Sequence, residues 1–186
     1  MESKLQIISG TYRGRKLVLP HGARPTQNRA RIALFNMLES NIIDTNAKMT
    51  VWDAFAGSGA FGVECISRYP GAKVIFTDTA PESIAAVRKN IAAISADNRS
   101  KIVPTDAIGA ITQFAPDTDI VFVDAPYDAA ELGRAFVNKL GRATKSGTIL
   151  VWEQEATNSV EPNADIWNTM RDKTYGRARF LILSRK

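Results

Sequence analysis

Apolar residues gather in five short runs, and most of the stretches between them are helical or loop-like in pattern. The runs cover residues 51–55, 73–76, 101–103, 120–123 and 148–152. Within them the apolar residues are mostly adjacent rather than alternating with polar ones, which predicts parallel strands buried on both faces. Between the second and third runs, Thr79 and Glu82 form a capping box, and a stripe at helical spacing follows it at Ile84, Val87, Ile91 and Ile94. A further helix fits residues 131–142.

Repeated strand–helix units predict an α/β fold. We expect a Rossmann-like, doubly wound and mostly parallel sheet, with its ligand crevice at the carboxyl ends of the strands. Residues 167–175 and 179–183 have no helix between them, only a turn at Gly176. They predict an antiparallel pair at one edge, which gives about seven strands.

The first 50 residues have a different pattern. Two strand-like segments around the Gly10–Gly14 turn predict a β-hairpin over residues 5–19. A helix follows, with Thr26 as its N-cap and an apolar face that includes Ala30, Leu34 and Leu38. We therefore expect a basic appendage, residues 1–50, packed on a body of residues 51–186.

Composition narrows the class of protein. The chain has 186 residues, 45% of them hydrophobic, with one cysteine, Cys65, and one histidine, His21. A single residue of each kind excludes an intramolecular disulfide and a multi-cysteine or multi-histidine metal site. The first residues resemble no export signal, and no apolar stretch approaches the ~20 residues that span a bilayer. We expect a metal-free cytoplasmic protein that is not bound to a membrane.

Charge is unevenly distributed along the chain. Residues 1–31 carry seven basic side chains against one acidic, residues 171–186 carry six against one, and the rest is net acidic. Such segregation favours a polyanionic partner, although basic ends could also serve solubility alone. The candidate nucleic-acid contacts are Arg13, Arg15, Lys16, Arg24, Arg29 and Arg31.

A glycine-rich loop follows the first predicted strand. Gly57, Gly59 and Gly62 satisfy G-x-G-x-x-G, and Asp78 ends the second strand, where an acceptor for a ribose hydroxyl belongs. Dinucleotide enzymes share this pattern. Asp53, just before the loop, would repel a pyrophosphate but attract the ammonium of an amino acid, so S-adenosyl-L-methionine fits better. Asp106, after the third strand, is placed either for the adenine amine or as a solvated loop carboxylate.

Asp124-Ala125-Pro126-Tyr127 follows the fourth predicted strand. An exocyclic amine of a base is a poor nucleophile, because its lone pair is delocalised into the ring. Hydrogen bonds to the Asp124 carboxylate and the Ala125 carbonyl would favour a pyramidal nitrogen, and Tyr127 would stack on the base. The alternative is a simple turn in which Pro126 sets the backbone.

Together these motifs resemble the RsmD family of 16S ribosomal RNA guanine-N2 methyltransferases, over nearly the whole chain. Residues 10–17 resemble the family's hairpin, residues 53–62 its cofactor loop, and residues 124–127 its Asp-Pro-Pro-Tyr/Phe motif. The resemblance implies methylation of a guanine in 16S rRNA, within the small ribosomal subunit or an assembly intermediate, by a monomer. The residues expected at the cofactor are Asp53, Phe55, Ala56, Gly57, Ser58, Gly59, Gly62, Asp78, Asp106, Ala107 and Asp124.

One departure from the family pattern bears on the chemistry. Ala125 replaces a proline, which frees the backbone whose carbonyl must hold the amine, so we expect a slower but active enzyme. Two alternatives remain at this point. One is an amino-methyltransferase acting on adenine N6 in DNA or on a protein glutamine. The other is a binding protein that keeps the cofactor fold without catalysis.

Overall fold

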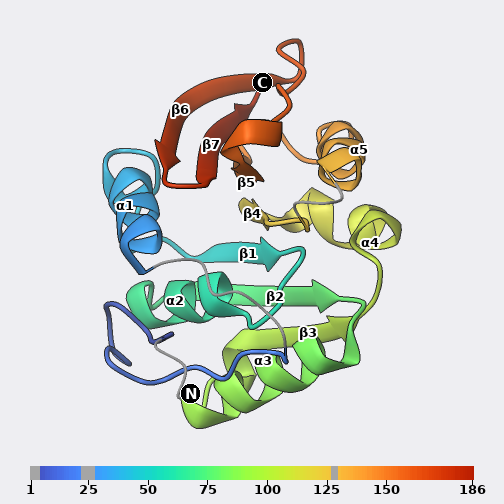
Figure 1. The fold of residues 1–186 in the computed structure, drawn as a ribbon. Coiled ribbons are helices and arrows are strands. Elements are labelled where there is room, and N and C mark those ends of the chain that lie inside the picture. The colour runs from blue at the N-terminus through green and yellow to red at the C-terminus, as the bar shows by residue number, and fades with distance from the viewer. Residues whose placement is uncertain (1–4, 22–27, 127–129) are drawn as a thin grey trace.

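The computed structural model describes residues 5–21, 28–126 and 130–186, which form a seven-stranded sheet with helices on both faces (Figure 1). The strands are β1 (Met49–Asp53), β2 (Ala72–Asp78), β3 (Ser100–Pro104), β4 (Ile120–Val123), β5 (Ile149–Glu155), β6 (Trp167–Tyr175) and β7 (Ala178–Arg185). The helices are α1 (Asn28–Glu39), α2 (Ala60–Arg68), α3 (Pro81–Ala93), α4 (Ala107–Phe114) and α5 (Ala130–Leu140).

The strand order is β3-β2-β1-β4-β5-β7-β6, and the first five strands are parallel. β7 pairs antiparallel with both β5 and β6. The Rossmann-like sheet of about seven strands is therefore confirmed. The chain runs outward from β1 to β3 and then returns to β4, so the order reverses between β1 and β4. A ligand crevice in such a sheet lies at this reversal, outside the carboxyl ends of the strands.

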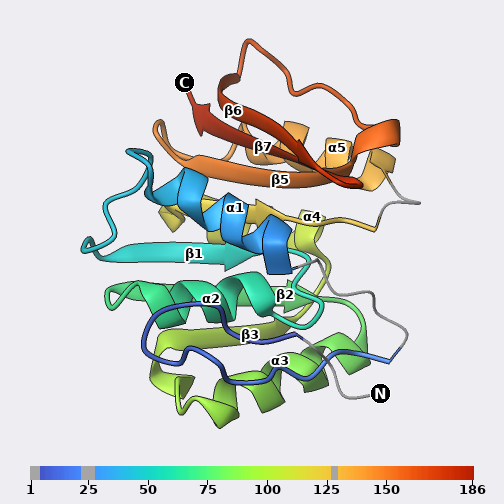
Figure 2. The same ribbon diagram turned by 60° about the vertical axis from the view of Figure 1, so that its left-hand side comes forward.

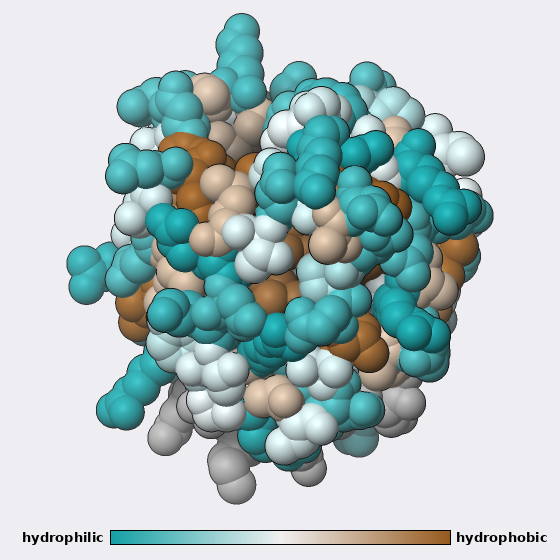
Figure 3. Space-filling model, turned by 90° about the horizontal axis from the view of Figure 1, so that it is seen from above, coloured by the Kyte–Doolittle hydropathy of each residue, from teal (hydrophilic) through white to brown (hydrophobic). Residues whose placement is uncertain are grey.

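The two faces of the sheet bury separate apolar clusters. Side chains of α1, α2 and α3 pack on one face with Val51 and Phe122. On the other face α4 and α5 pack with Trp52 and Val121. The edge strand β6 is largely exposed, and the surface seen in Figure 3 is mostly hydrophilic with separate apolar spots. Charged side chains on an edge strand discourage pairing with another sheet.

Helix boundaries differ from the sequence-based expectations in three places. Helix α4 was not predicted, because it is short and contains Gly109. Helix α3 begins at Pro81 with Ala80 as its N-cap and no side-chain cap, so the predicted capping box at Thr79 is wrong. The helix expected over residues 131–142 is α5, which ends at Leu140. Thr26, the N-cap predicted for α1, lies outside the described residues.

The N-terminal arm, residues 5–19, lies along α2 and α3 (Figure 2). Its predicted hairpin is reduced to a single antiparallel bridge between Gln6 and Lys16. Ile7 N donates to Arg15 O at 2.9 Å on one side of that bridge, and Leu17 N donates to Leu5 O at 2.9 Å on the other. The apolar side chains of Leu5, Ile7 and Leu17 are buried in the same cluster as α1 and α2. The division into units of 1–50 and 51–186 stays a prediction.

Within the described residues, no helix is long and apolar enough to cross a membrane, and no group of three potential metal ligands occurs.

Candidate active site

Two carboxylates meet where the strand order reverses. Asp53 ends β1 and Asp124 follows β4, and the register places Asp53 opposite Phe122, two residues before Asp124. These are the positions expected from the sequence. They place both acids at the crevice.

The glycine loop bends sharply between β1 and α2. Gly57 and Gly59 have φ angles of 53° and 73°, which residues other than glycine rarely adopt. A Cβ atom added to Gly57 would have no neighbour within 4 Å, so the loop presents bare backbone to open space there. Gly57 N donates to the Asp78 carboxylate at 2.8 Å, which ties the loop to the end of β2.

Gly62 has a packing role. A Cβ at this position would lie 2.3 Å from the ring of Phe76, so glycine is needed for α2 to approach β2. Its backbone N–H also donates to Asp53 Oδ2 at 3.1 Å. Gly62 therefore supports the site from beneath the loop, a reason that the sequence pattern did not reveal.

Asp53 is 1% exposed, and its Oδ1 atom has no hydrogen-bond partner among the described residues. Burial raises the pKa of its carboxyl well above the usual value, and the nearby charges of Asp124 and Asp78 add to the effect, against the Gly62 N–H. An unpaired buried oxygen is costly. The ammonium of an amino acid would give Oδ1 a partner, so this donor set fits S-adenosyl-L-methionine.

Asp124 is partly buried, and the loss of hydration raises the pKa of its carboxyl to about 7. Ala125 is buried and Pro126 is exposed. The fourth residue of the motif, Tyr127, lies outside the described residues. The carboxyl and carbonyl expected to hold an amine therefore come from a turn that directly follows the fully buried strand β4.

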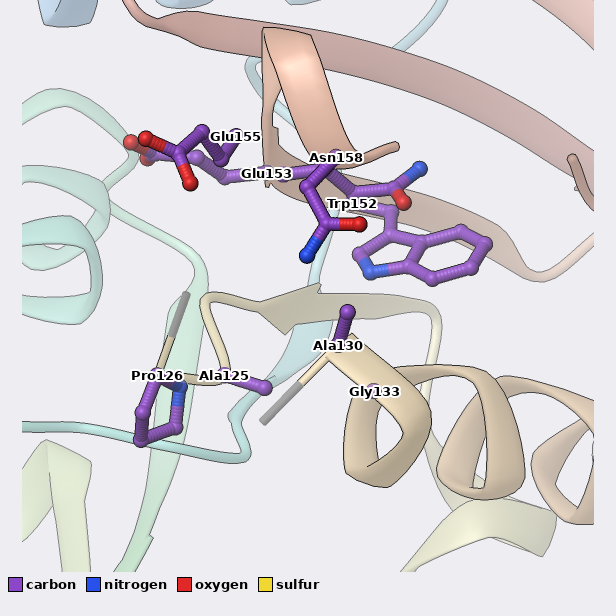
Figure 4. Close-up of a pocket in the computed structure, with 9 residues that line it drawn as sticks. Ala125, Pro126, Ala130, Gly133, Trp152, Glu153, Glu155 and Asn158 are labelled. Carbon is purple, nitrogen blue, oxygen red and sulfur yellow. The ribbon is translucent and has the colours of Figure 1, made fainter. Parts of the chain in front are cut away.

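A small pocket of about 10 Å³ adjoins this turn and has room for roughly one water molecule (Figure 4). In Figure 4 the side chain of Asn158 points toward Ala125 and Ala130, whereas Glu153 and Glu155 extend to another side. Among the described residues its walls come from this turn, α5, the carboxyl end of β5 and the short 3-10 helix Ala156–Asn158 that follows it: Ala125, Pro126, Ala130, Gly133, Trp152, Glu153, Gln154, Glu155 and Asn158.

Gly133 in this wall was not singled out from the sequence. A Cβ there would lie 3.4 Å from the Ala125 Cβ and 3.3 Å from the Trp152 indole nitrogen, so glycine lets α5 approach the turn closely.

Other predicted cofactor residues are placed as follows. Asp106 caps α4, with Oδ2 accepting from Gly109 N at 2.7 Å, and the adjacent Ala107 is buried. Phe55 packs edge-on against Phe136, with ring centroids 5.4 Å apart. Ser58 O accepts a hydrogen bond from Asn90 Nδ2 at 2.8 Å. Asn90 is a buried residue that the sequence-based prediction missed.

The predicted RNA contacts divide into two groups. Arg13, Arg15, Lys16 and Arg29 are exposed. Arg31 is 4% exposed and forms an ion pair with Glu64 at 3.0 Å. Burial lowers its pKa against the opposing effect of Glu64. The prediction that Arg31 contacts RNA is therefore wrong, because its guanidinium is enclosed between α1, α2 and the arm. Arg24 lies outside the described residues.

The pKa of Asp124 leads to a prediction about pH. Its raised value means that ionisation disfavours the folded state, so this carboxyl contributes less to stability as pH rises from about 4 toward 7. The role expected for Asp124 as an acceptor for an amine requires the ionised form. We expect kcat/KM for the methyl donor to rise with pH to a plateau, with an apparent pKa of about 7. A rate profile over pH 5.5–8.5 tests this. A profile unchanged in Asp124→Asn would contradict it.

Comparison with known proteins gives consistent results. The family model described as "Conserved hypothetical protein 95" matches residues 5–184. "Ribosomal RNA small subunit methyltransferase D" of Escherichia coli (strain K12) is 35% identical over 189 residues, which cover 98% of this chain and 91% of the relative. The Haemophilus influenzae protein of the same name is 27% identical, covering 94% of this chain and 91% of the relative.

Solved structures agree with this match. The yhhF structure from Escherichia coli has a TM-score of 0.79 at 31% identity and covers 99% of both chains. An RNA methyltransferase from Salinibacter ruber, solved in complex with S-adenosyl-L-homocysteine, has a TM-score of 0.66. At 15% identity, over 87% of this chain and 94% of the other, that second likeness supports the fold alone.

Proposed function

This chain belongs to the RsmD family of methyltransferases, and we propose that it transfers a methyl group from S-adenosyl-L-methionine to the N2 amine of a guanine in 16S ribosomal RNA. One observation carries the chemistry. The Asp124 carboxyl and the Ala125 carbonyl directly follow β4, beside the end of β1, where the sheet order reverses.

Three acidic residues would hold the cofactor. Asp53 Oδ1 would accept from the amino-acid ammonium, since it lacks any other partner among the described residues. Asp78 already fixes the loop through Gly57 N, and a carboxylate has lone pairs left for a ribose hydroxyl. Asp106 would meet the adenine amine from the start of α4. When bound, the sulfonium supplies an electrophilic methyl group, so the chemistry depends on alignment.

The acceptor amine would lie between Asp124 and Ala125. One N–H donates to the Asp124 carboxylate and the other to the Ala125 carbonyl, which leaves the nitrogen lone pair directed at the methyl group. The bound donor would supply the methyl group for the new C–N bond and keep the electron pair of the broken C–S bond on its sulfur. The amine proton then leaves, first to the ionised Asp124 and from there to solvent.

Two observations support ribosomal RNA as the acceptor. The matched relatives in Escherichia coli and Haemophilus influenzae are named for the small-subunit RNA. Arg13, Arg15 and Lys16 are exposed together on the arm and would bind phosphates. Such a protein would act in the cytoplasm, on the small subunit or an assembly intermediate. A monomeric state stays a prediction.

Ala125 gives a prediction about rate. Ala125→Pro should raise kcat by up to about fivefold, since proline reduces the backbone freedom that alanine leaves, an effect of ~1 kcal/mol. Proline at this position would remove none of the hydrogen bonds among the described residues, because none of them uses the Ala125 N–H. Ala125→Gly should lower kcat by a similar factor. Single-turnover methyl transfer measures both variants, and an order other than proline above alanine above glycine would refute this role of the backbone.

A labelled methyl donor tests the function. Purified protein is incubated with tritiated S-adenosyl-L-methionine and small-subunit particles that lack the modification, and RNA and protein are then separated. We expect label in 16S RNA. Label in ribosomal protein would favour a glutamine methyltransferase. In a parallel reaction with DNA in place of the particles, label in the DNA would favour an adenine methyltransferase. Cofactor binding without turnover would indicate a protein that has lost catalysis.

A further inference from the structure

Asn90 joins the N-terminal arm to the glycine loop. It lies on α3, is 1% exposed, and forms three hydrogen bonds through its side-chain amide. Oδ1 accepts from Val18 N at 2.8 Å, and Nδ2 donates to Val18 O at 3.0 Å and to Ser58 O at 2.8 Å. Both amide hydrogens are thereby used, one toward each segment.

The hydrogen bond from Asn90 to Ser58 O affects the glycine loop, where the cofactor would bind. Ser58 stands between Gly57 and Gly59, and its carbonyl shares a peptide plane with the Gly59 N–H, which donates to Ala56 O at 2.6 Å. By holding Ser58 O, Asn90 fixes the orientation of this peptide. The loop conformation that would receive the cofactor therefore depends on a side chain from a different helix.

The two hydrogen bonds between Asn90 and Val18 hold the arm close to the basic residues that would bind RNA. Val18 follows Lys16 by two residues, and Lys16 belongs to the bridge that also positions Arg15. Both Val18 backbone groups are held by Asn90, much as a neighbouring strand would hold them. Residues 16–18 thus form a short segment that Asn90 fixes at Val18. A shift of the arm toward phosphates would be transmitted to Val18.

We propose that Asn90 is a positioning residue that couples RNA binding on the arm to cofactor binding at the glycine loop. This inference rests on the proposed function. RNA that orders the arm around Val18 favours the arrangement in which Asn90 also holds Ser58 O. The cofactor requires the same arrangement, so each ligand increases the affinity of the other by the same factor.

S-adenosyl-L-homocysteine is a suitable probe, because it binds without reacting. Its Kd is measured by calorimetry alone and with saturating small-subunit particles, for the wild type, Asn90→Ala and the matched control Lys89→Ala, which alters an exposed neighbour on α3. For the wild type and Lys89→Ala we expect particles to lower the Kd at least about fivefold. For Asn90→Ala the change should fall below about twofold, because neither segment is then tied to the other.

Two results would overturn the coupling: a wild-type Kd that does not respond to particles, or an Asn90→Ala variant that responds as the wild type does. Asn90→Asp provides a second variant, which keeps the acceptor for Val18 N but loses both donors. If neither variant folds, the coupling is tested by amide hydrogen exchange in the wild type, measured with and without RNA. RNA should slow exchange at Gly57 and Gly59 without cofactor, and unchanged exchange would refute the proposal.

The coupling and the proposed function fail separately. If the wild-type protein methylates particles but its Kd for S-adenosyl-L-homocysteine does not change when particles are present, the coupling is refuted and the proposed function stands. If the wild-type protein transfers no methyl group to RNA, the proposed function is refuted, whatever the effect of particles on its Kd for S-adenosyl-L-homocysteine.

Discussion

Asp124→Ala is expected to lower the rate of methyl transfer at least 100-fold, about 2.7 kcal/mol of transition-state stabilisation. The variant removes the only carboxylate of the motif, so the acceptor amine loses the group that draws its lone pair out of conjugation. Burial raises the pKa of this carboxyl to about 7, because its surroundings disfavour charge. Single-turnover kinetics with saturating donor and particles measures the loss.

Asp117→Ala is the matched control, because Asp117 is an exposed acid at the other end of β4. It should leave the rate within about twofold of wild type, in line with the small effect of most surface substitutions. Binding of S-adenosyl-L-homocysteine, followed in parallel, separates lost chemistry from a lost cofactor. A normal rate of methyl transfer by Asp124→Ala would refute the proposed mechanism.

Glu64→Ala is expected to cost about 3–5 kcal/mol of the free energy of unfolding, the range for breaking a buried ion pair on one side. Glu64 is fully buried on α2. Its carboxylate accepts from Arg31 at 3.0 Å and from Arg68 Nε at 2.7 Å. It also accepts from Ile8 N at 2.8 Å and Ser9 N at 2.9 Å. Without it two cations and two backbone N–H groups lose a partner, and the arm loses two of its hydrogen bonds to α2.

Urea unfolding of Glu64→Ala beside Glu82→Ala, an exposed acid on α3, provides the measurement. The control should lie within about 0.5 kcal/mol of wild type. Faster amide exchange at Ile8 and Ser9 in Glu64→Ala would show that the arm detaches. A loss below about 1 kcal/mol, the value of an exposed pair, would contradict the account.

Patterns local in sequence predicted the frame of the molecule well. Continuous apolar runs identified the parallel strands, because a strand buried on both faces has mostly apolar positions. The expected burial on both faces is wrong for β3, which lies at the sheet edge and is only partly buried. The missing helix before residue 179 identified the antiparallel edge. The acids Asp53, Asp78 and Asp124 were predicted at strand ends for the same reason, since the end of each apolar run marks where the backbone leaves the core.

Contacts between distant segments were not predictable in this way. Arg31 falls off the apolar stripe of its helix and looked exposed, but the arm covers that side and Glu64 meets it from α2. Asn90 interrupts the buried stripe between Val87 and Ile91, and Glu64 stands between Val63 and Cys65. A polar residue inside an apolar stripe is the available signal, because burial of such a group requires a partner. The partners themselves, 72 residues from Asn90 and 56 from Glu64, appear only in the fold.

The most direct test of the account identifies the methylated nucleoside. Small-subunit particles labelled by the wild-type protein are stripped of protein, the 16S RNA is digested, and the nucleosides are separated by mass. The account predicts that the transferred methyl group is recovered as N2-methylguanosine, and that Asp124→Ala yields none. Recovery as N6-methyladenosine, or as any base methylated on a ring atom, would contradict it.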